Sequence, residues 1–194
     1  MTDRLVEAYA YSENIFLRDS GIRDITALME VHDIELPDVG AGYLNTAPRM
    51  SPFTVVEDDR VKVTAVLVPH GPVFPAFAFR FDTDHGSITL SGDTRESDNL
   101  VNLAQGTDVL IHEAINVRGV DMPGALRDHL LESHVEVQMV GAVAERAGAK
   151  QLVLSHIADS AVDPLDPVQW KKWAQIGYGG PVTIGHDLQE IVVA

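Results

Sequence analysis

The sequence has no cysteine, no long apolar run and few positive charges. Without cysteine it has no disulfides, thiolate metal sites or cysteine nucleophiles, so any metal must be held by His and carboxylates. The polar start MTDRLVEAY does not resemble a signal peptide, and no apolar run could span a bilayer. We therefore expect a cytoplasmic protein with no membrane partner. The formal net charge of −15 disfavours nucleic acid as a partner, although a local pocket can still be positive.

One domain is expected over residues 1–194. The length and the 45% hydrophobic content are enough for a sizeable core. The N-terminal third has the weakest pattern, because its short apolar runs lead into GAGYLNTAPRMSPF, where Gly and Pro oppose long regular elements. The candidate functional residues are therefore expected after Val61.

The pattern after Val61 predicts an α/β fold. Residues 61–71 alternate apolar and polar side chains as a half-buried strand does, and residues 77–93 indicate two strands around an Asp-His-Gly turn. Helices are then predicted over 98–105, 134–147 and 167–176, and strands over 108–114, 151–156 and 181–187. This alternation implies parallel strands with helices packed against the sheet, where ligands bind at the carboxyl ends of the strands.

Two helices have recognisable ends. Ser133 and Glu136 are spaced as a capping box for the helix over 134–147, and Gly148 follows its last turn. Asp166 is a candidate N-cap for the next helix, with Pro167 at the first helical position.

Side chains of metal-ligand type follow several apolar strands. His70 follows AVLVP, Asp93 follows SITLSG, His112 and Glu113 close DVLI, and His156 closes QLVLS. Because the carboxyl ends of parallel strands share one edge, these side chains are expected to converge there. His70, Asp93 and His156 together form the candidate metal set.

Each residue also has an ordinary explanation. A histidine at a strand end can hydrogen-bond a loop, Asp93 can cap the following helix, and His134 is unremarkable in a first helical turn. We expect His85 to be solvated surface, His32 and His129 show no partner pattern, and His186-Asp187 fits either the site or a plain turn. Only the joint occurrence of the candidate set favours a metal.

The segment LSGDTRESDNLVNLAQGTDVLIHEA, with VLVPHG before it and SHVEVQMVGAVAERAGAKQLVLSHI after it, resembles a known family. It is similar to the C-terminal half of metallo-β-lactamase-fold hydrolases of the ribonuclease Z and arylsulfatase-like branch. The ending WKKWAQIGYGGPVTIGHDLQEI is similar to the arylsulfatase-like members. The resemblance implies an αββα sandwich with a dinuclear site, usually of two Zn²⁺ ions.

The resemblance also implies roles for single residues. His70 would complete the ligands of one metal, Asp93 would bridge both, and His156 would bind the second. His134 would act as general acid or stabilise developing charge, and Glu113 would orient its neighbours. Two cations would lower the pKa of a bound water, so that hydroxide attacks an ester near neutral pH.

The sequence departs from the family in three places. The motif HxHxDH, which supplies four ligands from the N-terminal half of the family, is absent, so residues 1–194 are expected to be a partial, C-terminal half of the domain. The 22 residues between His70 and Asp93 leave no room for the long arm that bacterial ribonuclease Z often carries. Val135 stands where that group usually has Ser.

The leading hypothesis is a zinc-dependent, arylsulfatase-like hydrolase of a small sulfuric or phosphoric ester. The alternatives are ribonuclease Z-like cleavage of phosphodiesters in tRNA 3′ processing, and a non-catalytic fragment or interaction domain that retains the fold. The chain alone is expected to be inactive, because its three ligands are too few for two zinc ions with about four donors each. Its expected protein partner is a second copy or the missing N-terminal half.

Overall fold

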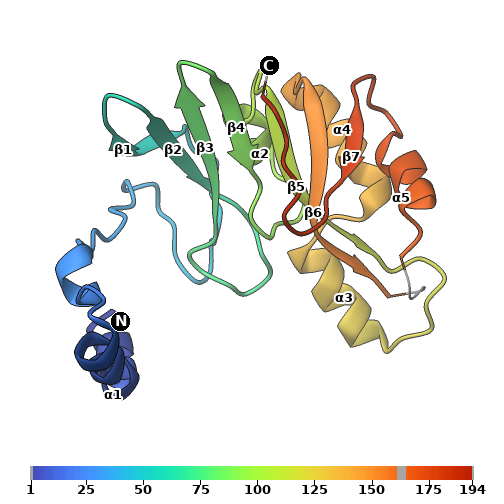
Figure 1. The fold of residues 1–194 in the computed structure, drawn as a ribbon. Helices are drawn as coiled ribbons and strands as arrows, with labels where there is room; N and C mark the ends of the chain where they lie inside the picture. The colour runs from blue at the N-terminus through green and yellow to red at the C-terminus, as the bar shows by residue number, and fades with distance from the viewer. Residues whose placement is uncertain (1, 161–164, 194) are drawn as a thin grey trace. The chain divides into compact units, whose positions relative to one another are not determined.

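The computed structural model describes residues 2–160 and 165–193 (Figure 1). The chain divides into two units, Met1–Leu36 and Pro37–Ala194. The first unit contains α1 (Thr2–Ser20) and the short 3₁₀ helix η1 (Ile25–Leu28). Residues 2–20 contain no Gly or Pro, which allows a long helix despite the weak apolar pattern, and α1 buries no residue. The expectation of one domain over residues 1–194 stays a prediction.

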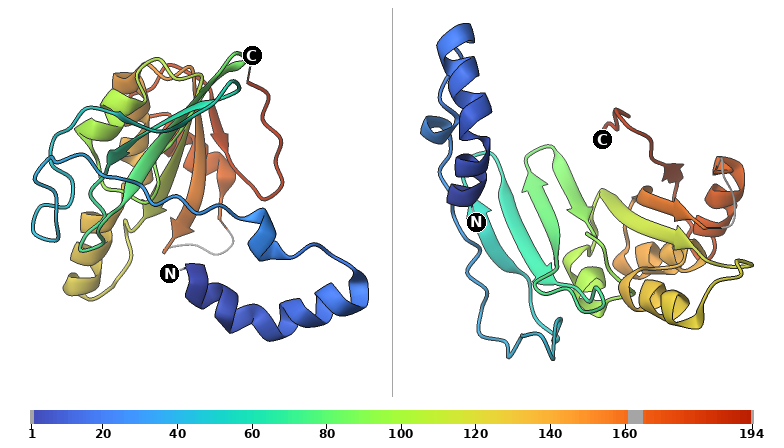
Figure 2. Two further views of the ribbon diagram at one scale, coloured as in Figure 1. Left: turned by 90° about the vertical axis from the view of Figure 1, so that its left-hand side faces the viewer. Right: turned by 90° about the horizontal axis from the view of Figure 1, so that it is seen from below.

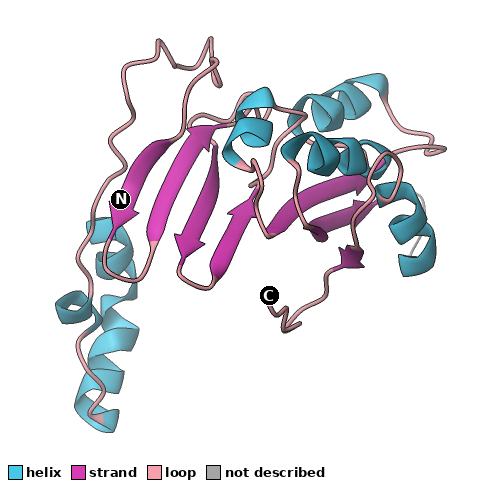
Figure 3. Cartoon of the chain, turned by 90° about the horizontal axis from the view of Figure 1, so that it is seen from above, coloured by secondary structure: helices cyan, strands magenta, loops and turns pink. Residues whose placement is uncertain are grey.

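The second unit is built on one sheet of seven strands in the order β1 to β7 (Figure 3). From β1 to β4 the neighbours are antiparallel, and from β4 to β7 they are parallel. The strands are β1 (Phe53–Glu57), β2 (Lys62–Leu67), β3 (Phe77–Thr83), β4 (Gly86–Leu90), β5 (Val109–Asn116), β6 (Gln151–Asp159) and β7 (Val182–Ile184). The parallel strands confirm the predicted α/β fold. Among the strands of the described residues, the sequence pattern missed only β1.

Helices form a layer against this sheet. They are α2 (Asp98–Leu103), α3 (Gly124–Ser133), α4 (Val137–Ala147) and α5 (Pro167–Ala174). α4 contacts α2, α5, β5 and β6, and Figure 2 shows α2 and α4 on the same side of the strands. At Gly141 a Cβ would lie 2.4 Å from the carbonyl oxygen of Ala174, so only glycine permits this approach of α4 to the end of α5.

The two faces of the sheet are covered to different degrees. Leu110 and Leu152 are fully buried, in the strands that α4 contacts. On the opposite face, Phe79 pairs with Leu90 and Leu90 with Ile111 in register, and Leu90 is 37% exposed. The described residues therefore form one sheet with one helical layer, which is part of the predicted sandwich.

The structure corrects the predicted start of one helix and confirms that of another. The helix predicted over 134–147 begins at Val137, because α3, which the pattern missed, ends at Ser133. The capping box is wrong: Glu136 is the N-cap residue and makes no side-chain cap hydrogen bond. In contrast, Asp166 caps α5 as predicted and accepts hydrogen bonds from the backbone N–H groups of residues 168 and 169.

Candidate metal centre

Three side chains predicted from the sequence lie together at the carboxyl side of the sheet. Asp93, His134 and His156 each offer a ligand atom, and these atoms lie within 4.8 Å of one another. His156 Nε2 is 3.4 Å from Asp93 Oδ2. His70 is not part of this cluster, but its ring centroid lies 5.0 Å from that of His134, whose ring lies 5.6 Å from that of His156. The four residues form one group.

Asp93 is positioned by a tight turn after β4. Gly92 has a φ of 60°, and a Cβ there would lie 2.5 Å from the carbonyl oxygen of Phe77. Two residues beyond Asp93, the backbone N–H of Arg95 donates to the carbonyl of Pro69. The turn is thereby tied to the strand segment that precedes His70, so the placement of the two side chains is linked.

His156 occupies a β-bulge rather than the end of a strand. β6 continues to Asp159, and the pairing passes from Glu113–Ser155 to Ala114–Ile157, so His156 is the extra residue. Its φ is 45°, which is rare for a residue other than glycine. Bulges redirect side chains, and backbone strain of this kind is frequent at functional sites. The bulge gives His156 its place beside Asp93.

His70 is held by the end of α3. The turn after His70 uses Gly71 at a φ of 51°, and the Gly71 N–H donates to the carbonyl of Glu132. His70 Nδ1 lies 2.9 Å from the carbonyl oxygen of Ser133, which can only accept. The Nδ1–H tautomer is therefore favoured, and Nε2 keeps the lone pair that a metal requires.

The buried side chain of Glu113 lies against His134, which is partly buried and belongs to the cluster. Glu113 Oε1 accepts a 2.7 Å hydrogen bond from the Val135 N–H, and Oε2 lies 3.3 Å from His134 Nδ1 without hydrogen-bond geometry. Burial raises the pKa of Glu113 to about 8. Burial and the neighbouring His70 lower the pKa of His134. At neutral pH, Glu113 therefore holds a proton beside a neutral imidazole.

His112, also predicted at a strand end, lies inside β5 and is fully buried. Its Nδ1 lies 2.6 Å from the carbonyl oxygen of Glu113, and Nε2 has no hydrogen-bond partner. Burial lowers the pKa of His112 to about 4, so it is neutral. It is not among the clustered donor atoms.

The remaining histidines differ in position. His85 is exposed in the β3–β4 turn, as predicted, and His129 is exposed on α3. His32 lies 3.0 Å from Glu30, a contact that the sequence pattern did not suggest. His186 Nδ1 lies 3.1 Å from the Asp187 carbonyl, in a turn that lines a cavity of about 450 Å³ with His156. The turn explanation for His186 therefore fits the structure, and its membership of the metal site stays a prediction.

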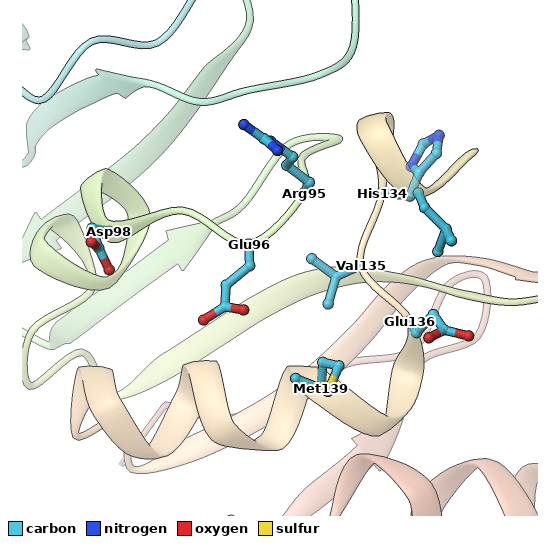
Figure 4. Close-up of a pocket in the computed structure, with 8 residues that line it drawn as sticks. Arg95, Glu96, Asp98, His134, Val135, Glu136 and Met139 are labelled. Carbon is cyan, nitrogen blue, oxygen red and sulfur yellow. The ribbon is translucent and has the colours of Figure 1, made fainter. Parts of the chain in front are cut away.

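A cavity of about 450 Å³ opens beside His134 (Figure 4). Arg95 lines it opposite His134, and Met139 of α4 lies on its floor. Sequence reasoning did not single out Arg95, although it follows Asp93 by two residues in SGDTR. Exposed arginines have no periodic signal, so only the folded structure shows that this one faces the site.

Sequence comparison finds ribonuclease Z proteins. The chain is 36% identical over 138 residues to ribonuclease Z of Mycobacterium tuberculosis strain H37Ra, covering 70% of the chain and 50% of the relative. With ribonuclease Z of Mycobacterium marinum it is 31% identical over 141 residues, covering 72% of the chain and 50% of the relative. The chain thus spans about half the length of these relatives. No family model matches.

Structural comparison agrees on the fold. The metallo-β-lactamase fold protein YhfI from Bacillus subtilis matches with a TM-score of 0.55 and 20% identity over 69% of this chain and 49% of its own. The short form of human tRNase Z matches with a TM-score of 0.51 and 24% identity over 74% and 46%. In residues 2–160 and 165–193 no helix has the length and apolarity to cross a membrane. The chain therefore has the metallo-β-lactamase fold, and its sequence is similar to that of ribonucleases Z.

Proposed function

We propose that this chain supplies one side of a dinuclear metal centre that hydrolyses phosphodiesters. The observation that carries the proposal is the convergence of Asp93, His134 and His156. The relatives are ribonucleases Z, which favours a phosphodiester over the sulfuric ester of the arylsulfatase-like hypothesis. The alternative is a non-catalytic role of the chain, and the experiments below distinguish it from the proposed function.

The donor set fits a metal such as zinc. Imidazole nitrogen and carboxylate oxygen are zinc ligands, and the chain contains no thiolate to compete with them. His70, Asp93 and His156 are the residues that would hold the metal ions, and Asp93 would serve both. The bound metals would supply a hydroxide at neutral pH and charge stabilisation for the attacked phosphorus.

The remaining groups position and move a proton. The Glu113 carboxyl holds the backbone at Val135 and faces His134 Nδ1, which orients the imidazole. At neutral pH the proton comes from the Glu113 carboxyl: His134 would accept it at Nδ1 and give the proton on Nε2 to the leaving oxygen. Its place within the donor cluster also makes it a candidate ligand, so the two roles must be separated experimentally.

Metal binding by the purified chain tests the site directly. Asp93→Asn and His156→Gln should each lower the zinc bound at equilibrium with free zinc, measured by equilibrium dialysis and elemental analysis, because each removes a ligand. His85→Gln, on the exposed hairpin turn, is the matched control and should bind as the parent does. Equal zinc in the parent and both site variants would overturn the proposed centre. His134→Gln should keep its zinc if this residue only moves a proton.

Activity is tested with two chromogenic esters. Bis(4-nitrophenyl) phosphate and 4-nitrophenyl sulfate should be compared in the zinc-loaded chain and in the product of the complete reading frame. We expect the chain alone to be inactive and the complete product to prefer the phosphodiester in a chelator-sensitive way. The DNA upstream of Met1 decides whether such a product exists: an in-frame HxHxDH supports it, and a stop codon followed by unrelated sequence supports a non-catalytic chain.

A further inference from the structure

Arg95 connects two cavities at the edge of the candidate metal centre. The first, of about 450 Å³, also includes His134. The second, of about 430 Å³, is lined by Arg95 together with Arg49, Asn45 and Thr46 from the loop before β1. Arg95 therefore lines both the cavity that includes His134 and the cavity that includes Arg49.

Both arginines are free to bind a ligand. Within residues 2–160 and 165–193, neither Arg49 nor Arg95 has a side-chain hydrogen bond or an ion pair. The carboxylates that line these cavities are paired with other arginines: Glu96 and Asp98 with Arg146 of α4, and Glu136 with Arg118. Figure 4 shows the Arg95 side chain leaving the loop away from Glu96, whose carboxylate points toward α4.

The backbone holds both arginines in place. The side chain of Asn99, which is 5% exposed, donates to the carbonyl of Pro48 and accepts from the N–H of Met50, so it clamps the chain on both sides of Arg49. Arg95 is fixed through its N–H to the carbonyl of Pro69. Because the buried Asn99 side chain fixes the backbone around the exposed Arg49, less backbone entropy is lost when a ligand binds.

We propose that Arg49 and Arg95 form an anion subsite that binds a phosphate adjacent to the one at the metal centre. Guanidinium groups bind phosphate oxygens in pairs, which suits them to this role. The substrate would then carry consecutive phosphates, as a single-stranded oligonucleotide does, rather than the single charge of an aryl sulfate. This inference rests on the proposed function and names its substrate class.

The chain has a formal net charge of −15, so a polyanion is repelled by most of its surface. Arg49 and Arg95, which have no ion pair within the described residues, can therefore bind such a ligand. Each contact of this kind releases counterions and makes the affinity fall with salt.

Binding is measured on the metal-free chain in chelator, by fluorescence anisotropy of a labelled oligouridylate across a salt series. Arg49→Gln and Arg95→Gln should each weaken binding several-fold and lower the slope of log affinity against log salt by about 0.7. The control is Lys171→Gln with Lys172→Gln, which removes the same two charges from exposed positions on α5. The control should bind as the parent does.

The inference is overturned if the parent does not bind, or if the double lysine control loses as much affinity as a variant that combines Arg49→Gln with Arg95→Gln. The first result would mean that the arginines are ordinary solvated surface, and the second that only net charge matters. Because chelator removes metal, either result leaves the zinc measurements on Asp93→Asn untouched. Conversely, equal zinc in the parent and in Asp93→Asn, together with normal oligonucleotide binding by the parent, would refute the metal centre alone.

Discussion

The buried and open sides of the candidate metal centre differ in solvent exposure and in hydrogen bonding. On the buried side, Glu113 and His112 are 3% and 0% exposed, and the Glu113 carboxyl is held by a backbone N–H. On the open side, Arg49 and Arg95 are exposed and make no side-chain hydrogen bonds within the described part of the chain. The buried side positions His134, and the open side is free to bind substrate.

This difference has an electrostatic cause. Removing a carboxyl from water penalises its charged form, which raises the pKa of Glu113 to about 8. An exposed guanidinium keeps its hydration and its charge, so it contributes little to folding but attracts anions. Substitutions on the two sides should therefore separate stability from binding.

The largest effect is expected for Glu113→Ala. The Val135 N–H would lose its partner inside the protein and a cavity would remain, so the free energy of unfolding should fall by about 3 kcal/mol. Urea denaturation measures the loss. Glu113→Gln keeps an acceptor oxygen and should lose less than about 1 kcal/mol. If both variants lose the same amount, the hydrogen bond to Val135 does not anchor this side.

The pH dependence of stability tests the protonation of Glu113. Its pKa is 4.5 in the unfolded state and about 8 in the folded state. Its contribution to stability is therefore full below the lower value and lost as pH rises through the upper one. The stability advantage of the parent over Glu113→Gln should shrink across this window in urea titrations with chelator. A constant difference would show that Glu113 is ionised in the folded protein.

A smaller effect of opposite sign is expected for His156→Gly. Glycine adopts a φ of 45° without strain, so this variant should be about 1 kcal/mol more stable than His156→Ala. Thermal or urea unfolding measures the difference, and both variants should lose zinc. Equal stability of the two would show that the bulge carries no strain.

The smallest effect on stability is expected for Arg95→Gln. The side chain is exposed and has no ion pair within the described residues, so the free energy of unfolding should stay within about 0.5 kcal/mol of the parent. The same urea titration measures it alongside oligonucleotide binding. If Arg95→Gln lowers the free energy of unfolding as much as Glu113→Ala does, then Arg95 stabilises the fold and the two sides do not differ in this respect.

Much of the fold was predictable because its central strands follow simple rules. β5 and β6 are apolar and alternate with α2 and α4, a pattern that specifies parallel strands without knowledge of distant contacts. The helix α3 was missed because its ends carry no clear cap: Pro123 precedes it and it makes no side-chain cap hydrogen bond. Ser133 and Glu136 have the spacing of a capping box, but they lie where the chain passes from α3 to α4.

The sequence by itself determined which residue types are available at the site: no thiolate, and His or Asp after the apolar strands that end in PHG, SGD and LSH. Only the tertiary structure decided how they meet. The bulge at His156, the contact of His70 with Ser133 and the placement of Arg49 beside Arg95 depend on segments distant in sequence. Such contacts leave no local periodicity, because they arise from the pairing of strands and the docking of loops after each element has formed.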